Sequence, residues 1–128
     1  MSQARLEHVN ITVTDPDNTA ARLCRMFGWK VRWTGDAAVG GYSVHVGTDD
    51  SYLAIYNPGN LTGKTARRYT LTGGLNHVGV VVKDLDATTQ AVVAEGFTPR
   101  DHADYKPGRR FYFTDDADHV EYEVVCYA

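Results

Sequence analysis

The sequence predicts an α+β protein built from two tandem βαβββ modules, because one phrase of the chain occurs twice. Residues 6–29 read LEHVNITVTDPDNTAARLCRMFGW, and residues 75–97 read LNHVGVVVKDLDATTQAVVAEGF. A histidine holds the same place in both phrases, since His77 follows His8 by 69 positions. The same spacing separates Leu6 from Leu75, Val9 from Val78, Val13 from Val82, Asp15 from Asp84, and Asp17 from Asp86. Two copies indicate a tandem duplication and not a solenoid, which needs three or more repeats.

Length and composition support one ordinary globular domain. The chain has 128 residues, of which 43% are hydrophobic and 23% are charged, enough for a single hydrophobic core. The net charge of −3 leaves no basic footprint, so we expect no nucleic acid partner. No apolar run approaches the roughly 20 residues of a membrane span, so we expect no membrane partner. The N-terminus shows no signal-peptide core, and we expect a cytoplasmic protein.

Each phrase begins with a strand, because β-branched residues dominate residues 8–13 and 77–82. Alternate residues of a strand point to opposite faces. In the first copy one face carries Val9, Ile11 and Val13, and the other carries His8, Asn10 and Thr12. We therefore expect one face to seat a helix and the other to carry the histidine.

A helix follows each strand. Asp15 or Asp17 in the first copy, and Asp84 or Asp86 in the second, are suitable N-caps because a carboxylate accepts hydrogen bonds from free backbone N–H groups. Gly28 and Gly96 stand where a left-handed C-cap belongs, 68 positions apart. Helical spacing places Ala20, Leu23, Cys24 and Phe27 on the first buried face, and Leu85, Thr89, Val92 and Val93 on the second.

Three further strands complete each half. They are expected at residues 29–34, 42–47 and 51–57 in the first half and at 97–101, 109–114 and 120–128 in the second. The stretch between the halves is rich in Gly, Thr and basic residues and has no apolar periodicity, which is typical of a linker. We therefore divide the single domain, residues 1–128, into module 1 (1–57), a linker (58–74) and module 2 (75–128).

A metal site is the chemistry that the repeated histidines favour. Equivalent residues of two copies can meet across a pseudo-twofold axis, so His8 and His77 are candidates for one site. The last strand offers an acid, and acids inside strands are unusual because burying an unpaired carboxylate is costly. Glu121 lies nearer the turn, so we choose Glu123 as the buried acid; Ala54 occupies the equivalent place in the first copy. Two His and one carboxylate leave coordination positions open for water or substrate.

The whole chain resembles the vicinal oxygen chelate superfamily, also called the glyoxalase/bleomycin resistance/extradiol dioxygenase family. The resemblance rests on residues 6–29, on the restart LNHVGVVVKDLD and on the closing strands FYFTDDADHVEYEVV. Ala117 and His119 replace the Pro and Gly that are usual in the family's last turn. Ala54 replaces the acid of glyoxalase I-like members, which argues against four-ligand glyoxalase chemistry.

The resemblance implies sheets that curl around a cavity, with the helices outside. It implies His8, His77 and Glu123 as ligands of a divalent metal ion, which could be Fe(II), Mn(II), Ni(II) or Zn(II), and it makes Glu123 the catalytic residue. On the inner face, alternation places the candidate substrate-binding residues Asn10, Thr12, Tyr52 and Tyr56. Arg110 could pair with an anionic group of the substrate.

Two functions are open at this point. The first is a metal-dependent enzyme of the dioxygenase or lyase/isomerase type, in which the metal chelates vicinal oxygens of a small-molecule substrate. The alternative is a metal-free protein of the bleomycin-resistance type that sequesters a drug or metabolite. We also expect a homodimer, because many family members complete their architecture by pairing chains, and His8 could then reach the His77/Glu123 pair of the other chain.

Overall fold

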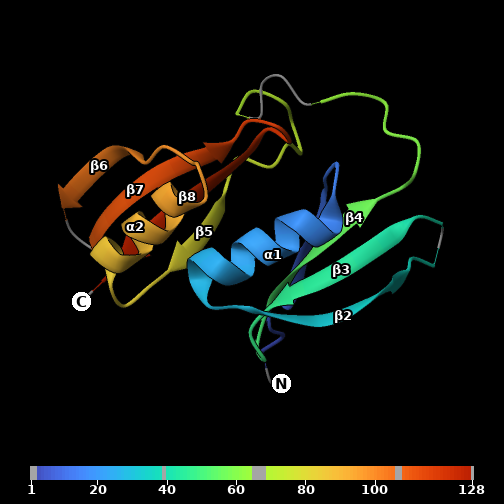
Figure 1. Cartoon of the computed structure of the whole chain (residues 1–128), viewed down its shortest axis with the longest axis horizontal. Coiled ribbons are helices and arrows are strands. Elements are labelled where there is room, and N and C mark those ends of the chain that lie inside the picture. Colours follow the sequence, from blue (N-terminus) through green and yellow to red (C-terminus); the bar gives the residue numbers. More distant parts are fainter. Residues whose placement is uncertain (1–2, 39, 65–68, 106–107, 128) are drawn as a thin grey trace. The chain divides into compact units, whose positions relative to one another are not determined.

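The computed structural model describes residues 3–38, 40–64, 69–105 and 108–127 and divides the chain into two compact units. The first unit spans residues 1–62 and the second spans residues 63–128. Both units have the same order of elements, a strand, a helix and three strands (Figure 1).

The first unit contains β1 (His8–Thr12), α1 (Pro16–Phe27), β2 (Lys30–Asp36), β3 (Tyr42–Gly47) and β4 (Tyr52–Asn57). The second unit contains β5 (Val78–Val81), α2 (Leu85–Ala94), β6 (Arg100–Tyr105), β7 (Gly108–Asp115) and β8 (Val120–Cys126). The four strands of each unit form one open sheet, in the orders β1-β4-β3-β2 and β5-β8-β7-β6. The first strand of each unit runs parallel to the last, and the other pairs are antiparallel. The predicted α+β class with two βαβββ modules is confirmed.

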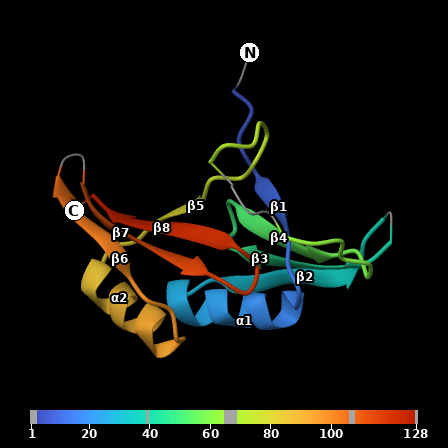
Figure 2. The same cartoon turned by 90° about the horizontal axis from the view of Figure 1, so that it is seen from above.

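Each helix covers one face of the sheet in its own unit (Figure 2). The centre of the apolar face of the first sheet is buried, with Val44, Val46 and Ile55 each no more than 1% exposed. Phe111, Phe113 and Val124 are equally inaccessible in the second sheet. Because side chains alternate along a strand, the opposite face of each sheet is left for polar groups.

Part of the predicted packing of α2 is wrong. The helix buries Leu85, Thr88 and Val92, whereas Val93 is 55% exposed and Thr89 only half-buried. Thr88 can be buried because its hydroxyl donates to the carbonyl of Asp84 at 3.0 Å, so no polar group is left without a partner. In α1, Cys24 and Phe27 are likewise half-buried, while Ala20 and Leu23 are buried as predicted.

The strand predicted at residues 97–101 begins later, as β6 at Arg100. The N–H of Phe97 still belongs to the end of α2, since it donates to the carbonyl of Val92 at 3.2 Å. Pro99 has no N–H to give to a sheet. The strand is also irregular after its first residue, because Asp101 has a φ of 55° where the register shifts.

The N-caps are Asp15 and Asp84, the first aspartate of each candidate pair. The carboxylate of Asp15 accepts from the N–H of Asn18 at 3.1 Å, and that of Asp84 accepts from the N–H of Ala87 at 3.0 Å. Gly28 ends α1 with a φ of 70°, as predicted. None of the helices described is long and apolar enough to cross a lipid bilayer.

Asp84→Ala is expected to lower the free energy of unfolding by about 1 kcal/mol, because it removes a cap hydrogen bond from the first turn of α2. Asp86→Ala removes the same charge from the same turn without touching the cap, so its cost should be a few tenths of a kcal/mol. Urea denaturation followed by circular dichroism measures both. Equal losses in the two variants would show that charge, and not the cap, stabilises this end.

Candidate metal centre

His77 and Glu123 lie together on the polar face of the second sheet. Glu123 is on β8, directly beside Gly79 of β5 in the sheet register, and His77 immediately precedes β5. The Nε2 atom of His77 is 3.3 Å from Oε1 of Glu123, with the two side chains 31% and 13% exposed. The sequence-predicted pair is therefore assembled by two parallel neighbouring strands.

The two oxygens of the Glu123 carboxylate have different partners: Oε2 accepts two hydrogen bonds, and Oε1 faces His77. Arg110 Nη1 donates to Oε2 at 2.8 Å, and the Tyr112 hydroxyl donates to the same oxygen at 2.9 Å. Burial by itself would raise the pKa of Glu123, but the hydrogen bonds from Tyr112 and Arg110, with nearby positive charge, lower it below its ordinary value. Glu123 is thus kept ionised, with Oε1 directed to the imidazole.

Glu121 is the more deeply buried of the two strand acids, which corrects the choice of Glu123 as the buried one. Its side chain is only 4% exposed, and Oε1 lies 4.0 Å from Nδ1 of His77. Its other oxygen, Oε2, accepts a short hydrogen bond from the guanidinium of Arg100, which also donates to the hydroxyl of Thr114 at 2.8 Å. The burial of Glu121 is therefore compensated by an ion pair.

The polar face carries a continuous row of basic and acidic side chains. His77 lies between the two acids, Glu121 and Glu123. Arg100 on β6 pairs with Glu121, and Arg110 on β7 pairs with Glu123. An arginine therefore lies beside each of the two carboxylates on this face and compensates the cost of burying it. Sequence reasoning missed Glu121 and Arg100 as members of this site. The alternation along β8 could have indicated Glu121, because it points to the same face as Glu123.

Gly79 leaves the approach to Glu123 open. A Cβ atom added at Gly79 would lie 4.0 Å from Oε1 of Glu123 and would meet nothing closer. The residue beside the carboxylate in the sheet therefore contributes no side chain that covers it.

The His77/Glu123 pair fits two ligands of one metal ion. Two donors each about 2.1 Å from an ion, at angles between octahedral and tetrahedral values, lie about 3.0–3.4 Å apart. The observed 3.3 Å falls in this range. Within either unit, however, the described residues bring together no three His, Cys, Asp or Glu side chains that could hold an ion.

His8 occupies the corresponding place in the first unit. It begins β1 opposite Tyr52 of β4, and its ring stacks on that tyrosine with centroids 4.9 Å apart. Nδ1 of His8 lies 2.9 Å from Oε1 of Glu7, which leaves Nε2 for another partner. The hydrogen bond from His8 lowers the pKa of Glu7 below its ordinary value, so this carboxylate is ionised.

The candidate substrate-binding residues of the first unit share the face of His8. In the sheet register Asn10 pairs with Ala54 and Thr12 pairs with Tyr56, and both β1 residues are exposed. The Tyr56 hydroxyl already donates to the carbonyl of Gly40 at 2.8 Å, so its ring is the part that remains for a ligand. The fifth candidate, Arg110, lies in the second unit, where it holds Glu123.

A ladder of stacked rings crosses this face from strand to strand. His8 stacks on Tyr52, which stacks on His45 at 4.6 Å, which contacts Trp33 at 5.0 Å. Arg32 lies over the Tyr52 ring, 4.4 Å from its centroid. Burial lowers the pKa of His45, with the neighbouring positive groups acting in the same direction, so its ring is kept neutral. The face therefore carries a row of aromatic rings beside the candidate ligand His8.

The register of both sheets follows the repeat. The pair Asn10 and Ala54 in the first unit corresponds to Gly79 and Glu123 in the second, with 69 positions between the copies. The carboxylate of the second unit is therefore replaced by the buried methyl group of Ala54 in the first. The duplicated strands thus carry two histidines and a single acid at these positions.

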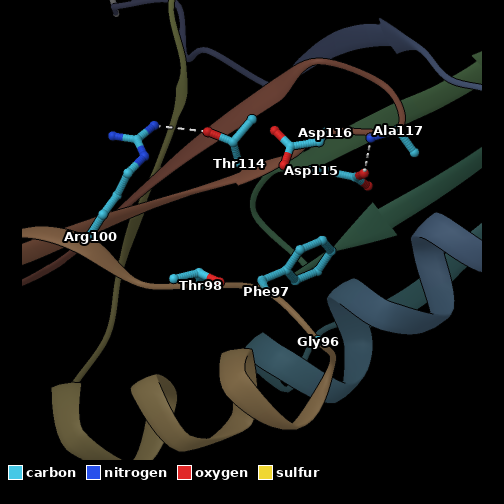
Figure 3. Close-up of a pocket in the computed structure, with 8 residues that line it drawn as sticks. All are labelled: Gly96, Phe97, Thr98, Arg100, Thr114, Asp115, Asp116 and Ala117. Atoms are coloured by element: carbon cyan, nitrogen blue, oxygen red, sulfur yellow. Dashed lines mark hydrogen bonds between the residues drawn. The ribbon is translucent and has the colours of Figure 1, made fainter.

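A separate hollow of about 380 Å³ lies at one end of the second unit, and none of the candidate site residues lines it. Its lining comes from Gly96, Phe97, Thr98, Arg100, Thr114, Asp115, Asp116 and Ala117 (Figure 3). Arg100 points toward Thr114 at this end of the sheet, so the hollow adjoins the ion pair that holds Glu121 (Figure 3).

The sequence matches the Glyoxalase/Bleomycin resistance protein/Dioxygenase superfamily over residues 7–113. No curated protein matches it. The fold is similar to a glyoxylase/bleomycin resistance protein/dioxygenase domain from Frankia sp. EAN1pec, with a TM-score of 0.81, 18% identity and coverage of 99% of this chain and 100% of the other.

Two further structures have the same fold. The fosfomycin resistance protein FosX from Listeria monocytogenes, complexed with Mn(II) and a sulfate ion, gives a TM-score of 0.71 at 18% identity, covering 99% of this chain and 95% of FosX. TnmS3, an antibiotic binding protein from Streptomyces sp. CB03234, gives 0.75 at 15% identity, covering 100% of this chain and 99% of TnmS3. With the family match over most of its length, the chain belongs to the glyoxalase/bleomycin resistance protein/dioxygenase superfamily.

Proposed function

We propose that this protein is a divalent-metal-dependent enzyme that acts on a small molecule through two adjacent substrate oxygens. The observation that carries the proposal is the 3.3 Å separation of His77 Nε2 and Glu123 Oε1, with the other oxygen of Glu123 held by two donors. When hydrogen bonds hold one oxygen of a carboxylate, the other oxygen is oriented to bind a cation in a defined direction. The similarity in fold to a protein complexed with Mn(II) supports the same proposal.

We propose His8 as the third ligand, supplied by the same chain or by the second chain of a homodimer. Two imidazoles and one carboxylate accept Fe(II), Mn(II), Ni(II) or Zn(II). A bound divalent ion would act as a Lewis acid that polarises the substrate oxygens. Arg110 and Tyr112 would keep Glu123 ionised and oriented, and Asn10, Thr12 and the rings of Tyr52 and Tyr56 would contact the substrate. Reactions of the dioxygenase or lyase/isomerase type fit this arrangement.

A second candidate function is metal-free sequestration of a drug or metabolite. It is favoured by the ion pair of Arg110 with Glu123, because the guanidinium already compensates the charge that a metal ion would otherwise balance. The similarity in fold to an antibiotic binding protein supports it as well. The row of aromatic rings across the first sheet would supply apolar contact area for such a ligand.

Single replacements of the proposed ligands distinguish the two functions. His8→Ala and His77→Ala should each lose the Mn(II) bound by the wild type, measured by elemental analysis after gel filtration. His102→Ala, which removes an exposed imidazole from the second unit, should retain the ion. Retention of Mn(II) by both ligand variants would contradict the proposed centre.

A mixture of His8→Ala and Glu123→Ala chains tests whether the ligands come from two chains. If a homodimer shares its sites, each hybrid dimer contains one complete ligand set, and refolding the two variants together should restore Mn(II) binding that neither has alone. If the ligands come from one chain, the mixture should remain without bound Mn(II). A monomer by light scattering that still binds Mn(II) would exclude the shared site.

A further inference from the structure

We infer that Glu121 is a positioning residue, which fixes the imidazole of His77 so that Nε2 is presented beside Glu123. The role of this arrangement in metal binding rests on the proposed function. The contact itself lies entirely within the second unit.

The Nδ1 side of His77 is enclosed. This atom is buried, and no residue that the structure describes forms a hydrogen bond with it. The carboxylate oxygen Oε1 of Glu121 lies 4.0 Å away, an ion-pair separation. The side chain of Glu121 is only 4% exposed and is fastened by Arg100 through Oε2. A fixed negative charge therefore faces Nδ1 from a low-dielectric environment, where its effect on the ring is strongest.

This arrangement determines which nitrogen can bind a cation. An imidazole that directs an Nδ1 proton toward a carboxylate keeps the Nε2 lone pair for a ligand, and the same contact limits rotation of the ring. In His77, Nε2 is the atom that faces Glu123 at 3.3 Å. Glu121 thus acts through His77 and not on the ligand itself.

The first unit also places a carboxylate on the Nδ1 side of its histidine, at hydrogen-bond distance and from a different residue. Nδ1 of His8 is 2.9 Å from Oε1 of Glu7. The repeat does not explain this agreement, because Asn76 stands at the position of Glu7 and Tyr52 stands at the position of Glu121. Each candidate ligand histidine therefore has a carboxylate on its Nδ1 side, although the duplicated positions differ.

Glu121→Gln tests the inference, because it removes the charge and keeps the size of the side chain. In the metal-free protein, carbon-13 relaxation at Cδ2 of His77 should show a lower ring order parameter than in the wild type. The affinity for Mn(II) should fall about 10–100-fold, the usual effect of losing the partner that orients a ligand. The ring of Phe113, which is fully buried on the apolar face of the same sheet, serves as the internal reference for unchanged packing.

Glu7→Gln is the matched control. It should alter the ring of His8 and leave that of His77 unchanged, and its effect on affinity should be smaller because the His8 and Glu7 side chains are 44% and 61% exposed. If Glu121→Gln does not fold, Glu121→Asp keeps the charge and withdraws it by one methylene. It should loosen the His77 ring in the same direction.

Unchanged ring order of His77 in the Glu121 variant would overturn the inference, whatever the protein binds. Loosening of the ring with a 10–100-fold loss of Mn(II) affinity supports it in full. If the wild type binds no metal but the ring still loosens in Glu121→Gln, the proposed function fails and the positioning of His77 by Glu121 stands.

Discussion

Glu123→Gln is expected to reduce the affinity for Mn(II) by more than about 100-fold, beyond the 10–100-fold that loss of an outer orienting partner costs. The reason lies in the two donors on Oε2. Arg110 and Tyr112 both donate to this atom, so the amide oxygen of the glutamine will take its place. The amide NH2 group then stands where Oε1 faced His77, and an N–H donor cannot ligate a cation.

Isothermal titration of the metal-free variant with Mn(II) measures this effect, and circular dichroism verifies that the fold is kept. Asp116→Asn is the control, since it removes one exposed negative charge from the turn between β7 and β8 of the same unit. It should bind Mn(II) like the wild type. Equal affinities for wild type and Glu123→Gln would exclude Glu123 as a ligand.

Phe113→Ala is expected to lower the free energy of unfolding by about 3–5 kcal/mol, the range for removing a buried aromatic ring. Phe113 is fully buried on the apolar face of β7. Its ring stacks on Tyr122 with centroids 4.9 Å apart and lies 5.2 Å from Phe97, so the loss leaves a cavity between α2 and the sheet. Urea denaturation followed by far-ultraviolet circular dichroism measures the change.

Phe113→Leu is the matched variant, and because it leaves a much smaller cavity it should cost less than half as much. The two tryptophans, Trp29 and Trp33, both lie in the first unit, so their fluorescence reports that unit alone. If residues 1–128 fold as the single domain predicted, the fluorescence transition of Phe113→Ala should shift together with the circular dichroism. An unshifted fluorescence transition would show that the units unfold separately.

The fold could be predicted because the duplicated sequence shows the same strand and helix patterns twice. Strand, cap and glycine occur at equivalent places, and each copy supports the interpretation of the other, as Asp15 and Asp84 illustrate. The start of β6 could not be found in this way. Local propensity does not show that Phe97 remains tied to Val92 at the end of α2, nor that a residue such as Asp101 adopts a positive φ.

The candidate site was predictable in part for a different reason. Alternation identified the face on which His77 and Glu123 lie, and the register confirms that face. Alternation could not show which of Glu121 and Glu123 is more deeply buried. Glu121 is paired with Arg100, which lies on another strand. Contacts between side chains on β6 and β8 are set by strand order in the sheet, which no local pattern in the sequence specifies.

The most direct test of the central claim is the metal content of the wild-type protein. It should be purified without chelators, exposed anaerobically to Mn(II), Fe(II), Ni(II) and Zn(II) in turn, desalted and analysed for bound metal. The proposed centre of His8, His77 and Glu123 predicts about one ion per chain for at least one of these metals. A protein that retains none of the four would contradict a metal-dependent function and favour sequestration of a small molecule.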